Sequence, residues 1–522
     1  MSSTVLPPAN APTPVIPEPK FRRKILLAIF ILAAILVCLA IFLLSRAWPF
    51  SEKAVVQDLA EASDSTVTIS GFHPKYFPFP GCVLEGLVFH HGARQFTLIT
   101  IDKLDITGSY FGILRYHVPR IKAEGGHVLV PPFGSNLTFN TTHSNIVIDE
   151  IVADGSVVEF ASKDQQNQPV RFDVHQALLH NVRWDEPFTY RVKLHNPQPP
   201  GELTTSGKFG VWTTGHPGDT PVSGEYTFEH ADLGVYGGID GTLNSKGKFG
   251  GVLSHINIEG TTVTPDFEVT SGGHKEKLET KFDAYVDGTR GDTFLNRVDA
   301  RLGRSLVVTK GSIAGAEGKE GKSAQLNLSS IHGRIEDMLG LFVSGRSPMS
   351  GEVALRAKVE IPHGDLKFLE KVKVQGTFGI DDGSFSQADT QKNVNELSAG
   401  ARGENKDDPE TVLTDLKGRV VLERGVANFS DLSFHIPGAG ARLHGTFNIM
   451  NYKIDLHGDM RVDTEISKTS SGMKALLLKA MDPLFKKKKR GEVVPVHIGG
   501  TYNHPEFGLD LAHSDADKKS HK

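Results

Sequence analysis

The chain has 522 residues, of which 57 are Lys or Arg and 61 are Asp or Glu, so its formal net charge is −4. This near balance argues against a nucleic-acid-binding surface along the whole chain, and two Cys residues exclude a disulfide framework. With 54 Gly and 28 Pro, the composition favours many turns and short strands over helix bundles.

The segment from Ile25 to Leu44 contains no charged or strongly polar residue. As a helix it would span roughly 30 Å, the thickness of a hydrocarbon core, so we expect a transmembrane helix over 25–44. Four basic residues lie within 20–24 and only Arg46 follows closely, which places the N-terminus in the cytoplasm. The alternative is a cleaved secretory signal, with 45–47 as its cleavage site; the long apolar run favours the uncleaved anchor.

Both ends of the chain are expected to be disordered tails. Residues 1–24 form a short cytoplasmic tail with six Pro between positions 7 and 19. Residues 512–522 are polar and charged. Neither tail is long enough to form a domain.

From residue 66 onward, apolar and polar residues alternate in many short runs. This alternation is typical of strands with one face in water, and we expect roughly 25 strands of ordinary length. In one part of the sheet the candidates for the apolar face are Leu432, Phe434, Ile436, Phe447, Ile449, Ile454 and Leu456.

Helices outside the apolar segment are few. We expect a short helix over 55–62 and further helices near 331–343, 389–399 and 472–485. These cannot cover the apolar faces of so many strands. Either two sheets cover each other as tandem β-sandwiches, or one long curved antiparallel sheet surrounds an apolar groove that a ligand with apolar chains fills. The periodicity leaves both architectures open.

Several predicted strands open with Gly followed, one residue later, by an aromatic residue. Examples are Gly247-Lys248-Phe249 and Gly445-Thr446-Phe447. We interpret this pattern as the rim of a hairpin, where Gly supplies the turn geometry and the first inward side chain is large.

The small and charged stretch 311–323 is predicted to separate two β-rich regions. The N-terminal domain would cover 51–310 and the C-terminal domain 324–511. A second polar stretch, 401–410, is expected to be a surface loop.

The sequence contains no recognisable catalytic motif. Gly321-Lys322-Ser323 resembles the end of a phosphate-binding loop, but Ala316 stands where the motif needs its first Gly. The 22 His residues are scattered, and no carboxylate stands at metal-ligand spacing with His73, His90 and His91, which lie near one another in the sequence. We therefore expect no enzymatic activity, no cofactor and no metal.

Five basic residues directly follow the amphipathic segment 472–485. Near a membrane they would bind anionic headgroups, each contributing about 1 kcal/mol. Otherwise they form a solvated loop with a charge favourable at a helix C-terminus. The residues are Lys486, Lys487, Lys488, Lys489 and Arg490.

Several segments, taken in order, resemble the bacterial AsmA-like family. The C-terminal one, which includes GMKALLLKAMDPLF, is the most specific. After the N-terminal anchor, the similar segments are 67–89, 241–269, 333–343, 416–448 and 472–511.

The resemblance implies a protein anchored by a single helix in the inner membrane, with its bulk in the periplasm. Members of the family are associated with outer-membrane biogenesis, and their relatives resemble bridge-like lipid-transfer proteins, in which a β-groove carries phospholipid acyl chains. The expected partners are the inner membrane, phospholipid and envelope proteins, and not nucleic acid. The alternative function is a non-enzymatic scaffold or regulator of outer-membrane protein assembly.

Overall fold

The structure is a computed structural model. Within the part of the chain that it describes, no helix combines the length and the apolar character needed to cross a membrane. The predicted span 25–44, apart from Ile35, lies outside that part, as do 472–485 and Lys486 to Arg490. The described residues are 35, 48–92, 96–113, 115–131, 146–161, 169–183, 185–213, 216–270, 273–315, 321–343, 345–364, 366–387, 391, 392, 394, 395, 398, 414–462, 493–501 and 504–510.

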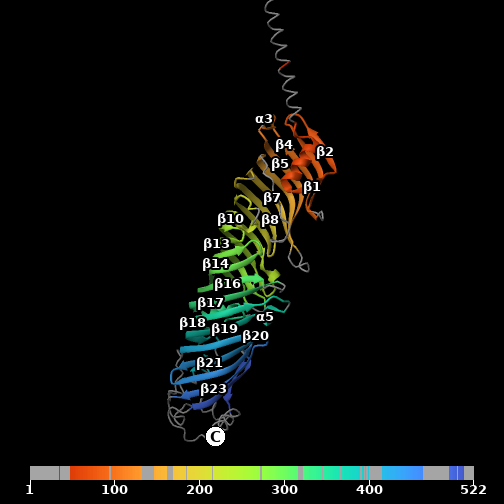
Figure 1. Ribbon diagram of the computed structural model, residues 1–522. Helices are drawn as coiled ribbons and strands as arrows, with labels where there is room; N and C mark the ends of the chain where they lie inside the picture. Colours follow the sequence, from red (N-terminus) through yellow and green to blue (C-terminus); the bar gives the residue numbers. More distant parts are fainter. Residues whose placement is uncertain are drawn as a thin grey trace, which may run out of the picture.

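Among the described residues, the strands form a single long sheet that curves like half a barrel (Figure 1). The strands pair in chain order except that β1 and β2 both pair with β3, and that β10 pairs with β12 while the short β11 pairs with the end of β13. The first strands lie at one end of the molecule and the last at the other. No second sheet packs on it within the described elements. The prediction of one long curved sheet is therefore confirmed, and the tandem β-sandwich alternative is wrong.

The first half of the sheet contains the strands up to β13. Their bounds are β1 (Ser65–Thr68), β2 (Gly71–Lys75), β3 (Gly81–His91), β4 (Phe96–Thr107), β5 (His117–Val130), β6 (Val147–Phe160), β7 (Val170–Val182), β8 (Phe188–Pro197), β9 (Pro200–Phe209), β10 (Pro221–Asp232), β11 (Ile239–Asp240), β12 (Thr242–Val252) and β13 (His255–Val269).

The second half continues to the C-terminal end. Its strands are β14 (Glu276–Asp287), β15 (Asp292–Leu302), β16 (Ser305–Gly315), β17 (Lys322–Arg334), β18 (Met349–Ile361), β19 (Lys373–Phe385), β20 (Thr414–Glu423), β21 (Val426–Ile436), β22 (Ala439–Asn448), β23 (Lys453–Val462), β24 (Val493–Thr501) and β25 (His504–Leu509).

Neighbouring strands are antiparallel except at one pair. β5 runs parallel to β6, with Ile121 opposite Ile151. A parallel pair needs a crossover connection rather than a tight turn, and 16 residues separate the two strands along the chain. The expectation of an antiparallel sheet throughout is wrong at this position.

Among the described residues, the helices are short, as expected. The helix predicted over 55–62 is α2 (Glu52–Ser63), where the Ser51 side chain accepts a hydrogen bond from the backbone of Ala54. The helix predicted near 331–343 is only α4 (Ile335–Gly340), because β17 continues to Arg334. The described residues between 391 and 398 are helical. In the described part of the chain, the remaining helices are α3 (Tyr110–Ile113), η1 (Pro217–Asp219), η2 (Leu233–Tyr236) and α5 (Phe368–Lys371).

The sheet continues through the stretch that the sequence marks as flexible. Gly311 lies within β16 and is directly opposite Leu326 of β17. These two strands pair from Val308 to Gly315. The described part of 311–323 therefore forms a β-hairpin within the sheet.

The two faces of the sheet differ in chemistry and in exposure. Along β13, Ile256 and Ile258 are half-buried, whereas Asn257 and Glu259 are exposed. Side chains on the concave side of a curved sheet converge and shield each other, while those on the convex side diverge. We therefore assign the apolar, better-covered face, which carries Ile258, to the concave side and call it the inner face.

At the N-terminal end, the chain itself covers the inner face. Val55 of α2 packs in a buried cluster with Leu84 and Leu87, which are completely buried. Cys82 belongs to the same cluster, and burial raises the pKa of its thiol to about 12. The cluster is a small conventional core that closes this end of the sheet.

A second cluster covers the inner face near the C-terminal end. Leu432, Ile436 and Leu443 are buried there, and Val394 packs against them. Ser398 donates a hydrogen bond of 2.8 Å to the carbonyl oxygen of Pro437. Between this cluster and the N-terminal one, α4 packs against the end of β17 and the start of β18, near Gly333 and the buried Val353.

Candidate functional site

One row of directly opposed residues crosses the inner face of almost the whole sheet. It contains no charged side chain, and only Thr205, Tyr226 and Thr309 bring polar groups to it. At about 4.8 Å between strands it extends roughly 100 Å. The row is Leu84, Leu104, Ala123, Ala153, Ala177, Val192, Thr205, Tyr226, Gly247, Gly260, Phe282, Val298, Thr309, Leu328, Ala357, Gly376, Val420, Phe429, Gly445, Leu456 and Ile498.

The apolar surface is several residues wide on the middle strands. The inner positions next to the row are also uncharged, and most are half-buried rather than buried. This surface, together with the row, is called the trough below. Its widening residues in β13, β14, β17 and β18 are Ile256, Ile258, Thr262, Leu278, Thr280, Ala284, Ala324, Leu326, Val353, Leu355, Val359 and Ile361.

Glycines in the trough make room for aromatic rings of neighbouring strands. A Cβ atom on Gly247 would lie 2.9 Å from a ring carbon of Tyr226, and one on Gly260 would lie 2.9 Å from the ring of Phe282. Both glycines lie in the middle of a strand, opposite each other. The interpretation of the Gly-x-aromatic pattern as a hairpin rim is therefore wrong: the glycines allow close packing on the inner face.

Two pairs of hydroxyl groups in the trough bond to each other, whereas the buried Ser330 hydroxyl, opposite Leu355, has no hydrogen-bond partner among the described residues. The Tyr226 hydroxyl lies 3.1 Å from the Ser245 hydroxyl, and Thr262 lies 2.7 Å from Thr280. Burial raises the pKa of Tyr226 above its ordinary value, so this phenol stays neutral. Because these hydroxyls satisfy each other, the surface offers mainly hydrocarbon to a ligand.

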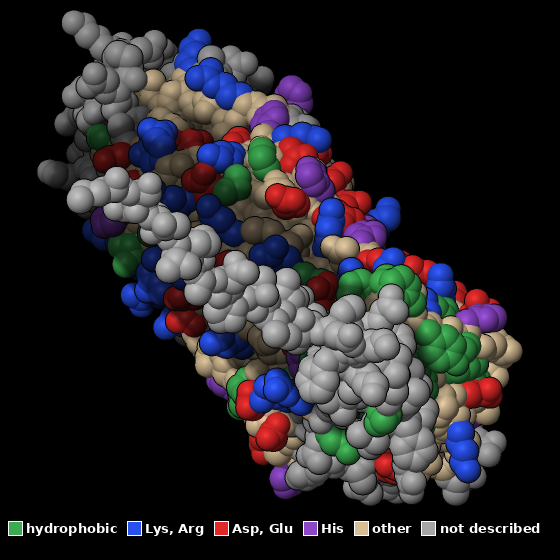
Figure 2. All heavy atoms as spheres, turned by 90° about the horizontal axis from the view of Figure 1, so that it is seen from above, with side chains coloured by type: hydrophobic (Ala, Val, Ile, Leu, Met, Phe, Trp, Pro, Cys, Tyr) green, Lys and Arg blue, Asp and Glu red, His purple; other side chains and the backbone are tan. Residues whose placement is uncertain are grey.

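The outer face is charged and solvated. In Figure 2, Lys and Arg lie among Asp and Glu along the side of the molecule that is turned toward the viewer. Neighbouring charges pair on single strands, as between Lys277 and Glu279 at 2.6 Å and between Arg297 and Asp299 at 2.8 Å. Exposed pairs of this kind contribute little to stability, but they keep this face in water.

The structure places the seven apolar candidates from the sequence at the C-terminal end. All but Ile449 lie on inner positions of β21, β22 or β23. Ile449 lies in the turn after β22, where its backbone N–H donates to the carbonyl oxygen of Gly425. Leu432 and Ile436 are buried against the chain's own side chains, so they form core rather than open surface. The open part of the trough lies between β6 and β20.

A group of exposed aromatic side chains lies at the N-terminal end. Phe77 is 88% exposed and Phe111 is 86% exposed, and Phe79 and Tyr76 are also exposed. The Tyr76 ring stacks on Trp48 at 5.4 Å between ring centroids. Figure 2 shows hydrophobic side chains gathered at the end of the molecule nearest the viewer. So many exposed rings in one place are typical of an interaction surface.

The trough presents no arrangement suited to bond-breaking chemistry in the described residues, and what it offers is a long hydrocarbon surface with one open side. Comparisons with family models, with curated proteins and with solved structures of other proteins give no match to this chain.

Proposed function

We propose that this protein holds or transfers phospholipid, with the acyl chains lying in the trough and the headgroups at its open side. The observation that supports this most strongly is the uncharged row from Leu84 to Ile498. A half-open apolar surface as long as the stretch between β6 and β20 is rare on proteins that bind nothing apolar. Because no covalent step is required, the absence of a catalytic motif in the sequence fits the proposal.

The location is part of the same proposal. The aromatic group near Phe77 lies at the end where the chain comes from the predicted transmembrane segment. Aromatic rings favour the membrane–water interface. We therefore place this end at the inner membrane and the rest of the sheet in the periplasm, and we assign the protein to an AsmA-like role in outer-membrane biogenesis.

The closed ends of the trough suggest which steps need motion. α2 covers the inner face near Leu84, and Val394 covers it near Leu432. With both coverings in place, acyl chains would occupy the open stretch between β6 and β20. Exchange with a membrane would require α2 to move from its position over the sheet.

Native mass spectrometry of the full chain tests the binding step. Released from detergent micelles in the gas phase, the protein should retain phospholipid, because contacts along an apolar trough persist without solvent. Lipid identified after extraction should be diacyl phospholipid from the host membrane. A folded protein that carries only detergent and no phospholipid would contradict the proposal.

A further inference from the structure

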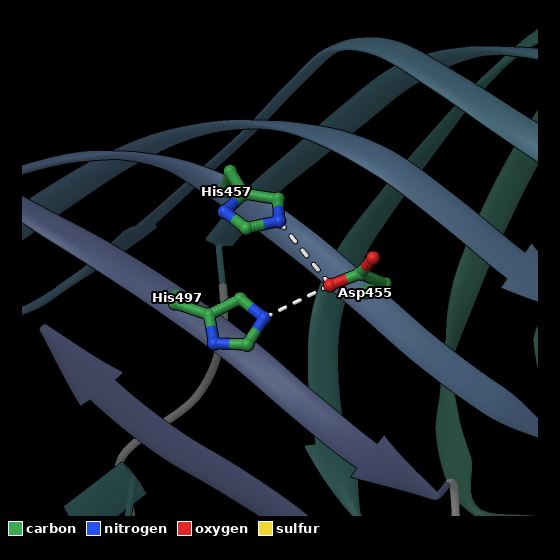
Figure 3. Close-up of side chains that lie close together, drawn as sticks. All are labelled: Asp455, His457 and His497. Carbon is green, nitrogen blue, oxygen red and sulfur yellow. Dashed lines mark hydrogen bonds and ion pairs between the residues drawn. The ribbon is translucent and has the colours of Figure 1, made fainter. Parts of the chain in front are cut away.

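Three side chains with metal-binding atoms meet on the outer face, near the C-terminal end of the sheet. Asp455 and His457 lie two residues apart on β23, so both point outward, and His497 lies directly opposite His457 on β24. Both imidazole rings point toward the Asp455 carboxylate (Figure 3). The carboxylate oxygen and one nitrogen from each ring lie within 4.8 Å of one another.

The distances come close to those of a metal site. The Nε2 atoms of His497 and His457 lie 2.9 Å and 3.2 Å from the same Asp455 oxygen, Oδ1. In a tetrahedral zinc site with bonds near 2.0–2.1 Å, two ligand atoms lie roughly 3.3 Å apart. Small side-chain rotations would therefore bring all three atoms to one ion. The rings lie 4.5 Å apart and nearly parallel, so neither blocks the other.

A buried carboxylate orients one of the rings. The Nδ1 atom of His457 donates a 2.6 Å hydrogen bond to Asp510, whose side chain is only 7% exposed. This bond fixes the ring and leaves its Nε2 atom facing Asp455 and His497. A His ligand whose second ring nitrogen donates to a carboxylate is the usual arrangement around protein-bound metals.

From this geometry we infer that Asp455, His457 and His497 bind a divalent transition-metal ion of the zinc type. Two imidazoles and one carboxylate suit Zn²⁺ and its first-row neighbours better than Mg²⁺ or Ca²⁺, which prefer oxygen ligands alone. The Nε2 atoms would bind the ion in place of their hydrogens, and water would complete the coordination. Asp510 would act as a positioning residue rather than as a ligand.

The site is separate from the trough, because it lies on the opposite face of β23 and β24. An ion bound there would tie the two strands together through side chains, in addition to their backbone pairing. It would also stabilise the folded chain by binding to it alone. The inference therefore stands or falls independently of lipid binding.

Zinc binding to the full chain tests this inference. The chain should be purified without a polyhistidine tag, stripped with a chelator and dialysed against micromolar Zn²⁺. His497→Gln should bind one zinc fewer per chain than the wild type, and Asp510→Asn should bind that zinc 10–100-fold more weakly. The control is His332→Gln, which removes another His that pairs with a carboxylate, that of Glu352. This variant should bind as much zinc, and as tightly, as the wild type.

Cobalt provides a second readout that background binding does not mimic. Co²⁺ added to the stripped wild type should give visible absorption bands of a low-symmetry, four- or five-coordinate site, and His497→Gln should lose them while its circular dichroism stays unchanged. Equal zinc content in the wild type and in folded His497→Gln, or the same cobalt spectrum from both, would overturn the inference.

Discussion

Ile258→Asp should lower the amount of phospholipid that co-purifies with the chain at least tenfold. Ile258 is half-buried on the inner face, between Phe249 of β12 and Ala284 of β14. An acyl chain lying there would remove water from the new carboxylate, which is unfavourable without a partner. A tenfold loss corresponds to about 1.4 kcal/mol, well below the cost of burying an isolated charge. Lipid extraction followed by mass spectrometry measures the effect.

The control for this experiment lies one residue earlier on the same strand. Asn257→Asp introduces the same side chain, but Asn257 is exposed on the outer face. This variant should retain as much lipid as the wild type, and any lipid held around the predicted membrane segment contributes equally to both variants. Equal lipid recovery from the two folded variants would argue against the trough.

Gly311→Ala should lower the free energy of unfolding by about 2–5 kcal/mol. Gly311 has a φ of +152°, and an added Cβ atom would lie 2.0 Å from the backbone oxygen of Gln325. Because that oxygen belongs to the paired strand β17, it cannot move aside without breaking the ladder. Denaturant titration followed by circular dichroism measures the change.

Gly315→Ala is the matched control on the same strand. Its added Cβ atom would find nothing closer than the Gly321 oxygen at 3.7 Å, so stability should change by less than about 1 kcal/mol. If the two variants were equally stable, Gly311 would not be held between paired strands, and the sheet would not be continuous at this hairpin.

Local sequence patterns predict much of this fold because they report on local geometry. Successive residues of a strand point to opposite faces of the sheet, so the apolar positions of an alternating run share one face. Phe434 and Leu456 were correctly placed on one face for this reason. The α2 helix was predicted because its apolar residues follow a helical period. The parallel pair β5–β6 was missed, because strand direction across a 16-residue connection leaves no mark on either strand.

Features that depend on distant segments could not be predicted. The burial of Leu432 and Ile436 depends on Val394, about forty residues earlier in the chain. Asp455 and His497 are separated by 42 positions, so their contact follows from the pairing of β23 with β24 and from no spacing rule. Similarly, Gly247 was interpreted as part of a turn. Its role could not be predicted locally, because the Tyr226 ring that needs the space beside it comes from another strand.

Photo-crosslinking in intact cells tests the central claim most directly. A benzophenone amino acid placed at Phe282 would lie on the inner face of β14, and one at Lys281 would lie beside it on the outer face. With ³²P-labelled phospholipid, ultraviolet light should label the chain from position 282 and leave position 281 unlabelled. Equal labelling from both positions, or no labelling from 282 in a folded chain, would contradict the account of the trough as a lipid-binding surface.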